Sequence, residues 1–158
     1  MNIQVACGTG KGHTKLAAFD AALNEAGVAN YNLIRLSSII PPNSNIDVKT
    51  PITDQPGGWG DRLYVVMAEM RVDTPNVEAW AGIGWVQDKD TGKGLFVEHE
   101  GNNETTVRRD IKASLEALMG TRKVDFGEIH MEVIGRTCTH DPVCALVIAT
   151  FNAQGWDS

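Results

Sequence analysis

One segment of this chain reads Asn32-Leu33-Ile34-Arg35-Leu36-Ser37-Ser38-Ile39-Ile40-Pro41-Pro42. An apolar strand leads into two hydroxyl side chains, and two prolines then end the regular structure. Such a strand end suits a peptide bond held under strain, where a side-chain hydroxyl can attack the carbonyl group before it. The segment therefore predicts that the chain cuts its own backbone and turns a serine into a catalytic carbonyl group.

Hydrophobic periodicity before this segment predicts a strand, a loop and a helix. Ile3 to Ala6 indicates a short strand, and the glycine-rich residues 8–12 indicate a loop, since their spacing fits neither a phosphate-binding loop nor a dinucleotide fingerprint. A helix is expected next, with Thr14 as its N-cap and Gly27 at its left-handed end. Its expected apolar stripe consists of Leu16, Phe19, Leu23 and Ala26.

The chain after Pro42 begins with residues 43–61, which show little periodicity and predict a long loop. Strands are then expected at Leu63 to Val72, Glu78 to Gln87, Leu95 to Glu98, Ile129 to Ile134 and Val143 to Phe151. The last two of these strands are expected to form a hairpin. Because many of the links have hairpin length, the sequence predicts one α+β domain over residues 1–158 with a largely antiparallel sheet.

A second helix is expected between the strand that ends at Glu98 and the final strands. Asn102 or Asn103 can cap its start, and Gly120 can end it. Its expected apolar stripe consists of Val107, Ile111, Leu115, Leu118 and Met119.

The overall composition is that of a globular domain: 158 residues, 42% hydrophobic and 22% charged, with a net charge of −6. This charge argues against nucleic acid as the main partner, because neutralisation of phosphates supplies most of that affinity. A negatively charged surface also tolerates a cationic small substrate better than an anionic one. No apolar run predicts a membrane span, and Met1 to Cys7 lacks a basic leader, so a cytoplasmic location is expected.

The three cysteines are Cys7, Cys138 and Cys144. An odd number of cysteines in such a chain does not indicate a disulfide framework. Three possible zinc ligands lie close together in the sequence: Cys138, His140 and Cys144. The cysteine spacing is too wide for a zinc knuckle, and no second ligand pair exists. We prefer the interpretation that small buried thiols flank a loop, and we expect no metal.

Two acidic positions are candidates for chemistry. Asp20 borders the apolar stripe of the first helix, so it is either an edge residue that reaches water or a buried group with a partner. Strand alternation puts Glu98 and Glu100 on the same face as Phe96. Either these carboxylates line a pocket in which burial favours the protonated form of one of them, or the face is exposed and both are solvated.

Together these segments resemble the pyruvoyl-dependent arginine decarboxylases. The resemblance is carried by residues 17–23 with Ala26-Gly27, by the segment from Asn32 to Pro42, and by Val97-Glu98-His99-Glu100-Gly101. A looser similarity runs across nearly the whole chain. The middle segment is the specific part, since a lone pair of serines would carry little information.

This resemblance implies a self-processed carboxy-lyase. The Ser38 hydroxyl would attack the Ser37 carbonyl to give an ester, and elimination and hydrolysis would leave a pyruvoyl group at position 38. The products would be a small chain of residues 1–37 and a large chain of residues 38–158. L-arginine would form a Schiff base with the pyruvoyl ketone, which acts as an electron sink as pyridoxal phosphate does elsewhere, and would leave as agmatine and carbon dioxide.

The resemblance also implies roles for three further residues and an assembly. Asn32 would polarise the attacked carbonyl group, Glu98 would return a proton to the substrate, and Asp20 would hold the guanidinium group in a bidentate pair. The implied fold is a four-layer αββα sandwich, assembled as a homotrimer or as a stacked hexamer. Three alternatives stay open: an uncleaved, non-catalytic homologue that binds a small amine, a structural subunit, and a decarboxylase of another basic amino acid.

Overall fold

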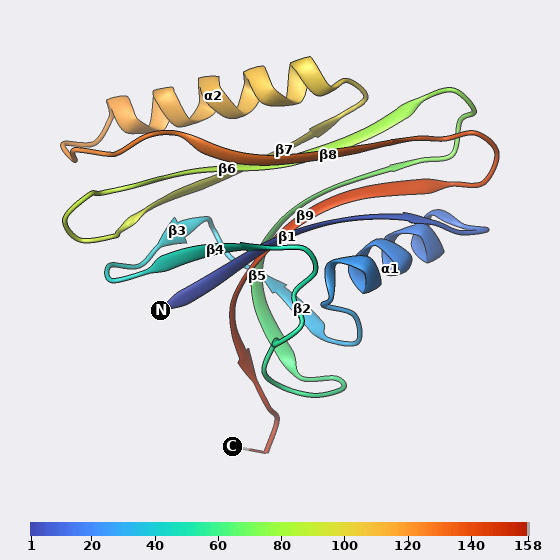
Figure 1. Cartoon of the computed structure of the whole chain (residues 1–158), viewed down its shortest axis with the longest axis horizontal. Coiled ribbons are helices and arrows are strands. Elements are labelled where there is room, and N and C mark those ends of the chain that lie inside the picture. The colour runs from blue at the N-terminus through green and yellow to red at the C-terminus, as the bar shows by residue number, and fades with distance from the viewer. Residues whose placement is uncertain (158) are drawn as a thin grey trace.

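The computed structural model describes residues 1–157 and arranges them as two sheets packed face to face with one helix on each outer side (Figure 1). The first sheet has the order β2-β5-β9-β1-β4. Its strands are β1 (Asn2–Lys11), β2 (Asn32–Arg35), β4 (Asn45–Lys49), β5 (Arg62–Val72) and β9 (Val143–Gln154). The second sheet has the order β3-β7-β6-β8. Its strands are β3 (Ile39–Ile40), β6 (Glu78–Gln87), β7 (Gly94–Gly101) and β8 (His130–Thr137).

The two helices complete the four layers. Helix α1 (Lys15–Ala26) packs on the outer face of the first sheet, and α2 (Glu104–Gly120) packs on the outer face of the second. The pairs β1–β4 and β2–β5 are parallel, and the other strand pairs are antiparallel. The predicted αββα sandwich with largely antiparallel sheets is confirmed.

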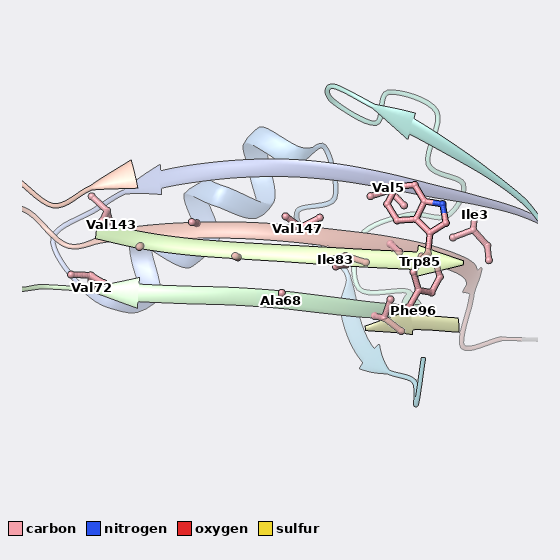
Figure 2. Packing of buried hydrophobic residues seen from close by; sticks show 14 of the residues in the cluster. Ile3, Val5, Ala68, Val72, Ile83, Trp85, Phe96, Val143 and Val147 are labelled. Atoms are coloured by element: carbon pink, nitrogen blue, oxygen red, sulfur yellow. The ribbon is translucent and has the colours of Figure 1, made fainter. Parts of the chain in front are cut away.

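The main core lies between the two sheets (Figure 2). Val5 and Val147 come from the first sheet, and Ile83, Trp85 and Phe96 come from the second. Each fully buried apolar side chain of this size contributes roughly 1.5–3 kcal/mol relative to an exposed one. This packing fixes β7 of one sheet close to β5 of the other, and the candidate site lies along these two strands.

Strand β1 is longer than predicted, because it continues through the glycine-rich residues that were expected to form a loop. A Cβ atom at Gly8 would overlap the carbonyl oxygen of Ala22, and one at Gly10 would overlap that of Ala18. The glycines therefore serve the close approach of helix α1 to the strand rather than a turn. The loop expectation for residues 8–12 is wrong for this reason.

The ends of α1 are as predicted, and its buried stripe is confirmed at Leu23 and Ala26 but not at Leu16. The Thr14 side chain accepts a hydrogen bond from the Ala17 N–H at 3.0 Å, and Gly27 ends the helix with φ of 89°. Leu16, expected in the apolar stripe, is 67% exposed. The buried residues of the helix are Ala18, Ala22, Leu23 and Ala26. Small side chains face the sheet because the backbone of α1 lies so close to β1.

Two further expectations fail at the level of pairing. Residues 43–61 are not one loop, because β4 within them pairs in parallel with β1. The last two strands do not form a hairpin, since β8 pairs with β6 in the second sheet and β9 pairs with β5 and β1 in the first. The expected turn between β6 and β7 is confirmed, with Gln87 opposite Gly94.

Helix α2 follows its prediction closely. Asn103 is the N-cap and accepts a hydrogen bond from the Thr106 N–H at 3.0 Å. Val107, Ile111 and Leu115 are buried against the second sheet, whereas Leu118 at the end of the expected stripe is exposed. Within residues 1–157, neither helix has the length and hydropathy needed to cross a membrane.

Candidate active site

The serine pair lies where the chain passes from the first sheet to the second, between β2 and β3. Both sides of the pair are anchored: the Leu36 N–H donates to the Val65 carbonyl at 2.8 Å, and the Phe96 N–H donates to the Ser38 carbonyl at 2.9 Å. Between these anchors Ser38 has φ of 74°, a left-handed conformation that costs free energy in a residue with a Cβ atom. The backbone is therefore strained beside the Ser37–Ser38 bond.

The hydroxyl group of Ser38 lies against a carboxylate. It donates to Glu98, with distances of 2.6 Å to Oε1 and 2.9 Å to Oε2. Burial raises the pKa of Glu98 above the ordinary glutamate value, although the Ser38 hydrogen bond and the charges of Arg35 and His99 oppose that rise. A carboxylate of raised pKa is a better proton acceptor than a solvated one, so the pair can transfer the hydroxyl proton.

Strand β7 holds this carboxylate in place through its alternation. Phe96 packs into the core between the sheets, whereas Leu95 and Val97 pack in the core beneath α2. On the α2 side of the strand, His99 Nε2 lies 2.7 Å from the hydroxyl oxygen of Ser114. The predicted alternation is thus confirmed, and Glu98 lies on the Phe96 face.

Two cavities meet at Glu98. The larger, of about 520 Å³, lies between the serine pair, β7 and the C-terminal half of α2. Its polar lining residues are Ser37, Ser38, Glu98, His99, Ser114 and Arg122. The smaller, of about 270 Å³, lies where β5 and β7 face each other, and Arg35, Glu98, His99 and Glu100 supply its polar side chains. Glu98 and His99 line both cavities, so one carboxylate can serve reactions on either side.

The smaller cavity combines the guanidinium group of Arg35 with two carboxylates, those of Glu98 and Glu100. Burial and the charge of Glu69 raise the pKa of Glu100, against the opposing charges of Arg35 and His99. Arg35 itself donates from Nη1 to the Met67 carbonyl at 3.3 Å, which holds its charge at the cavity. Sequence reasoning assigned no role to Arg35; its signal is a guanidinium in a largely apolar strand two residues before the serine pair.

The other two predicted site residues lie elsewhere in the chain. Asn32 is exposed at the opposite end of β2, where its Nδ2 donates to the Gly60 carbonyl at 2.7 Å. Asp20 is exposed on α1, in the outer layer that covers the first sheet. Neither lines the cavities at Glu98. Within one chain, the structure therefore brings together Ser37, Ser38 and Glu98 only.

The cysteines are structural in their placement. Cys138 is buried in the core between the sheets, whereas Cys144 is buried on the α1 side of the first sheet. Burial raises the pKa of Cys7 and of Cys144 to about 12, so both are thiols at neutral pH. Over residues 1–157, no group of three His, Cys, Asp or Glu side chains is arranged to hold a metal ion.

Comparisons with known proteins give a consistent family. The sequence model described as "Pyruvoyl-dependent arginine decarboxylase" matches residues 2–153. Curated proteins of that name are similar to this chain. The protein from Halobacterium salinarum is 36% identical over 157 residues, which cover 94% of this chain and 92% of the relative. The protein from Thermococcus kodakarensis is 29% identical over 145 residues, with 91% and 90% covered.

Two further similarities complete the comparison. The pyruvoyl-dependent arginine decarboxylase from Methanocaldococcus jannaschii is 35% identical over 120 residues, which cover 72% of this chain and 70% of the relative. Among solved structures, a pyruvoyl-dependent histidine decarboxylase at pH 8 has a TM-score of 0.46 and 13% identity, with 90% of this chain and 64% of that chain covered.

Proposed function

This chain belongs to the pyruvoyl-dependent arginine decarboxylase family, and from that premise we propose that it converts L-arginine to agmatine and carbon dioxide. The observation that carries the proposal is the hydrogen bond from the Ser38 hydroxyl to both carboxylate oxygens of Glu98. It puts a nucleophile and its proton acceptor beside the bond that we expect the chain to cut.

Self-cleavage would begin when the hydroxyl oxygen of Ser38 attacks the carbonyl carbon of Ser37 and Glu98 takes the hydroxyl proton. The amide bond becomes an ester, and the nitrogen of Ser38 becomes a free amine. Elimination then breaks the ester, releasing Ser37 as a carboxylate, and water replaces the nitrogen at position 38, which leaves as ammonia. The left-handed φ of Ser38 supports the proposal, because strain in the intact chain is relieved by the cut.

A pyruvoyl group at position 38 would supply the electron sink that decarboxylation of an amino acid needs. The residues around this position fit such a group, since Ser38 lines the cavity of about 520 Å³ together with Glu98 and His99. Glu98 would donate the proton that replaces the lost carboxylate, and its raised pKa favours the protonated form this requires. The same side chain thus acts first as a base and later as an acid.

Asp20 and Asn32 remain proposals for the assembled enzyme. Both side chains are exposed and lie away from the serine pair in a single chain, so each would act at the site of a neighbouring protomer. There Asp20 would hold the substrate guanidinium in a bidentate pair, and Asn32 would polarise the attacked carbonyl group. A homotrimer, alone or stacked as a hexamer, would provide such interfaces, and the exposed apolar side chains of Leu36 and Ile39 beside the serine pair support one there.

The proposal is tested by the intact mass of the purified protein and by its products. We expect two chains, of residues 1–37 and 38–158, a larger chain that reacts with carbonyl reagents, and release of agmatine from arginine. A single unbroken chain that binds amines without turnover would favour the non-catalytic homologue. Faster turnover of another basic amino acid would show that this amino acid, and not arginine, is the substrate. The cytoplasmic location expected from the sequence stays a prediction.

A further inference from the structure

A separate polar cavity of about 230 Å³ lies on the outer face of the first sheet, beyond the end of α1. Ile3, Val5 and Ala149 face the core between the sheets, so alternation turns Gln4 and Thr150 outward into this cavity. The segment that follows β4 closes it from the other side. The lining residues are Asn2, Gln4, Asp54, Gln55, Pro56, Thr150, Phe151, Asn152 and Ala153. None of them lines the cavities at Glu98.

Two of the lining side chains, those of Gln4 and Gln55, each have a buried oxygen atom without a hydrogen-bond partner. Gln4 is 7% exposed, and its Oε1 has neither a hydrogen-bond partner nor access to solvent. The Oε1 of Gln55 is also buried without a hydrogen-bond partner, whereas its Nε2 donates to the Pro56 carbonyl at 3.5 Å. Thr150, 2% exposed, lies beside them. Because a buried acceptor without a donor costs free energy, the cavity is built to receive hydrogen-bond donors.

The charge of the cavity selects the kind of donor. Asp54 is the one ionisable side chain in its lining, and no lysine, arginine or histidine lines it. An N–H-rich cation satisfies amide oxygens and balances a carboxylate at the same time, whereas an anion would be repelled by Asp54 and would meet no positive side chain in the lining. The volume holds about seven water molecules, which is room for a compact ammonium or guanidinium group.

We propose that this cavity is a second ligand site, for a small ammonium or guanidinium cation, with Gln4 and Gln55 as hydrogen-bond acceptors and Asp54 as the charge partner. The inference does not depend on decarboxylation, because it uses no residue of the Ser38 site. The competing occupant is a cluster of water molecules, which satisfies the same oxygens without preferring a positive charge.

The test uses a matched pair of ligands, methylguanidinium and methylurea, which have nearly the same shape and differ in charge. Binding to the full-length protein is measured by isothermal titration calorimetry, and the position of the ligand is found by a crystal soak. We expect methylguanidinium to bind with a Kd at or below about 1 mM and methylurea to bind at least tenfold more weakly. Equal binding of the two ligands, or only water in the cavity, would overturn the proposal.

Variants locate the binding. Gln4→Leu nearly keeps the side-chain volume but removes the acceptor, so it should weaken the binding of methylguanidinium about tenfold or more. Asp54→Asn, at an exposed position, should weaken it about threefold. Asp20→Asn is the control for guanidinium binding at the catalytic site, because Asp20 is the proposed guanidinium partner there, and it should leave binding at the second site unchanged. If Gln4→Leu does not fold, Asp54→Asn and the soak decide. Affinity lost in Asp20→Asn and kept in both other variants would refute the second site.

Discussion

Ser38 donates its hydroxyl hydrogen to Glu98 across 60 residues of sequence, at 2.6 Å from Oε1 and 2.9 Å from Oε2. The contact exists because β3 and β7 are neighbours in the second sheet and Phe96 N–H holds the Ser38 carbonyl beside them. The contact joins the strained end of one segment to a partly buried carboxylate on another.

The first prediction concerns the nucleophile. Ser38→Ala should leave the chain uncut, because no hydroxyl remains to attack the preceding carbonyl group. Ser37→Ala is the matched control: it removes the neighbouring hydroxyl but keeps the attacked carbonyl and the nucleophile, so it should still yield two chains. Intact-mass analysis of both proteins after prolonged incubation measures the result. A cut Ser38→Ala protein would show that another nucleophile is used.

The second prediction concerns Glu98 in both of its proposed roles. Glu98→Gln keeps the shape of the side chain but neither accepts nor delivers a proton at neutral pH. Cleavage should slow by about 10²-fold or more, and the fraction that does cleave should decarboxylate arginine about 10²–10⁴-fold more slowly. The two rates are measured separately, by mass spectrometry and by agmatine formation. An unchanged turnover per cleaved chain would remove Glu98 from the decarboxylation step.

The third prediction uses the charge of Arg35. Burial raises the pKa of Glu98, and the Arg35 cation opposes that rise, so Arg35→Gln should raise the pKa further. Cleavage needs the ionised form of Glu98, so the acidic limb of the pH profile for cleavage should move to higher pH. Turnover needs the protonated form of Glu98, so the basic limb of the pH profile for turnover should also move to higher pH. The checks are pH profiles of both reactions.

A control separates this effect from loss of any nearby charge. Arg71 pairs with Glu69 at 2.9 Å on the α1 side of β5, and its charge is not among those that shift the pKa of Glu98, so Arg71→Gln should leave both limbs in place. If Arg71→Gln and Arg35→Gln shift the profiles equally, the local role given to Arg35 is wrong.

The residues of the candidate site differ in how well sequence alone could find them. Ser38 and Glu98 each carry a local signal: a strand that runs into two prolines, and an acid on the same strand face as Phe96. Their contact carries no such signal, because the pairing of β3 with β7 is a long-range event. Arg35 carries a local signal as a cation in a largely apolar strand, but its effect on Glu98 depends on which strands close around it. Asp20 and Asn32 are exposed in the single chain, so the roles proposed for them would need a neighbouring chain.

The fold shows the same division between local pattern and long-range pairing. Alternation located β5, β6 and β9 well, but it reports only that one face is buried. In a sandwich either sheet offers that burial, so the pattern could not tell that β8 and β9 lie in different sheets. The glycines of β1 predict a loop from the sequence alone, although a closely packed helix also requires glycines in a strand.

The fourth prediction tests that helix contact. Gly10→Ala would push a methyl group into the backbone of α1 near Ala18, so the free energy of unfolding should fall by about 1–3 kcal/mol or more. Gly120→Ala is the control at the end of α2, where an added Cβ meets nothing within 4 Å; its stability should be unchanged or slightly higher. Urea denaturation measures both, in a Ser38→Ala background that keeps the chain whole. Equal stability of the two variants would mean that β1 and α1 are not in close contact.

The fifth prediction asks whether one protomer completes the site of another. Asp20 is exposed on α1 and lines neither cavity at Glu98, so the proposed guanidinium contact requires a neighbour. Asp20→Asn and Ser38→Ala should each be nearly inactive as pure proteins. Mixed by co-expression in equal amounts, they should recover about a quarter of wild-type activity, since random assembly pairs an intact Asp20 with an intact Ser38 at that frequency.

The matched control is Glu25→Gln, which changes another exposed acid on the same helix whose carboxylate accepts from the Thr9 N–H at 3.1 Å. It should retain arginine turnover, because it removes a negative charge from α1 without touching the proposed contact. Recovery in the Asp20→Asn and Ser38→Ala mixture would show that the two residues act across an interface. Two inactive variants that stay inactive when mixed would place both roles in one protomer, and a fully active Asp20→Asn would remove Asp20 from substrate binding.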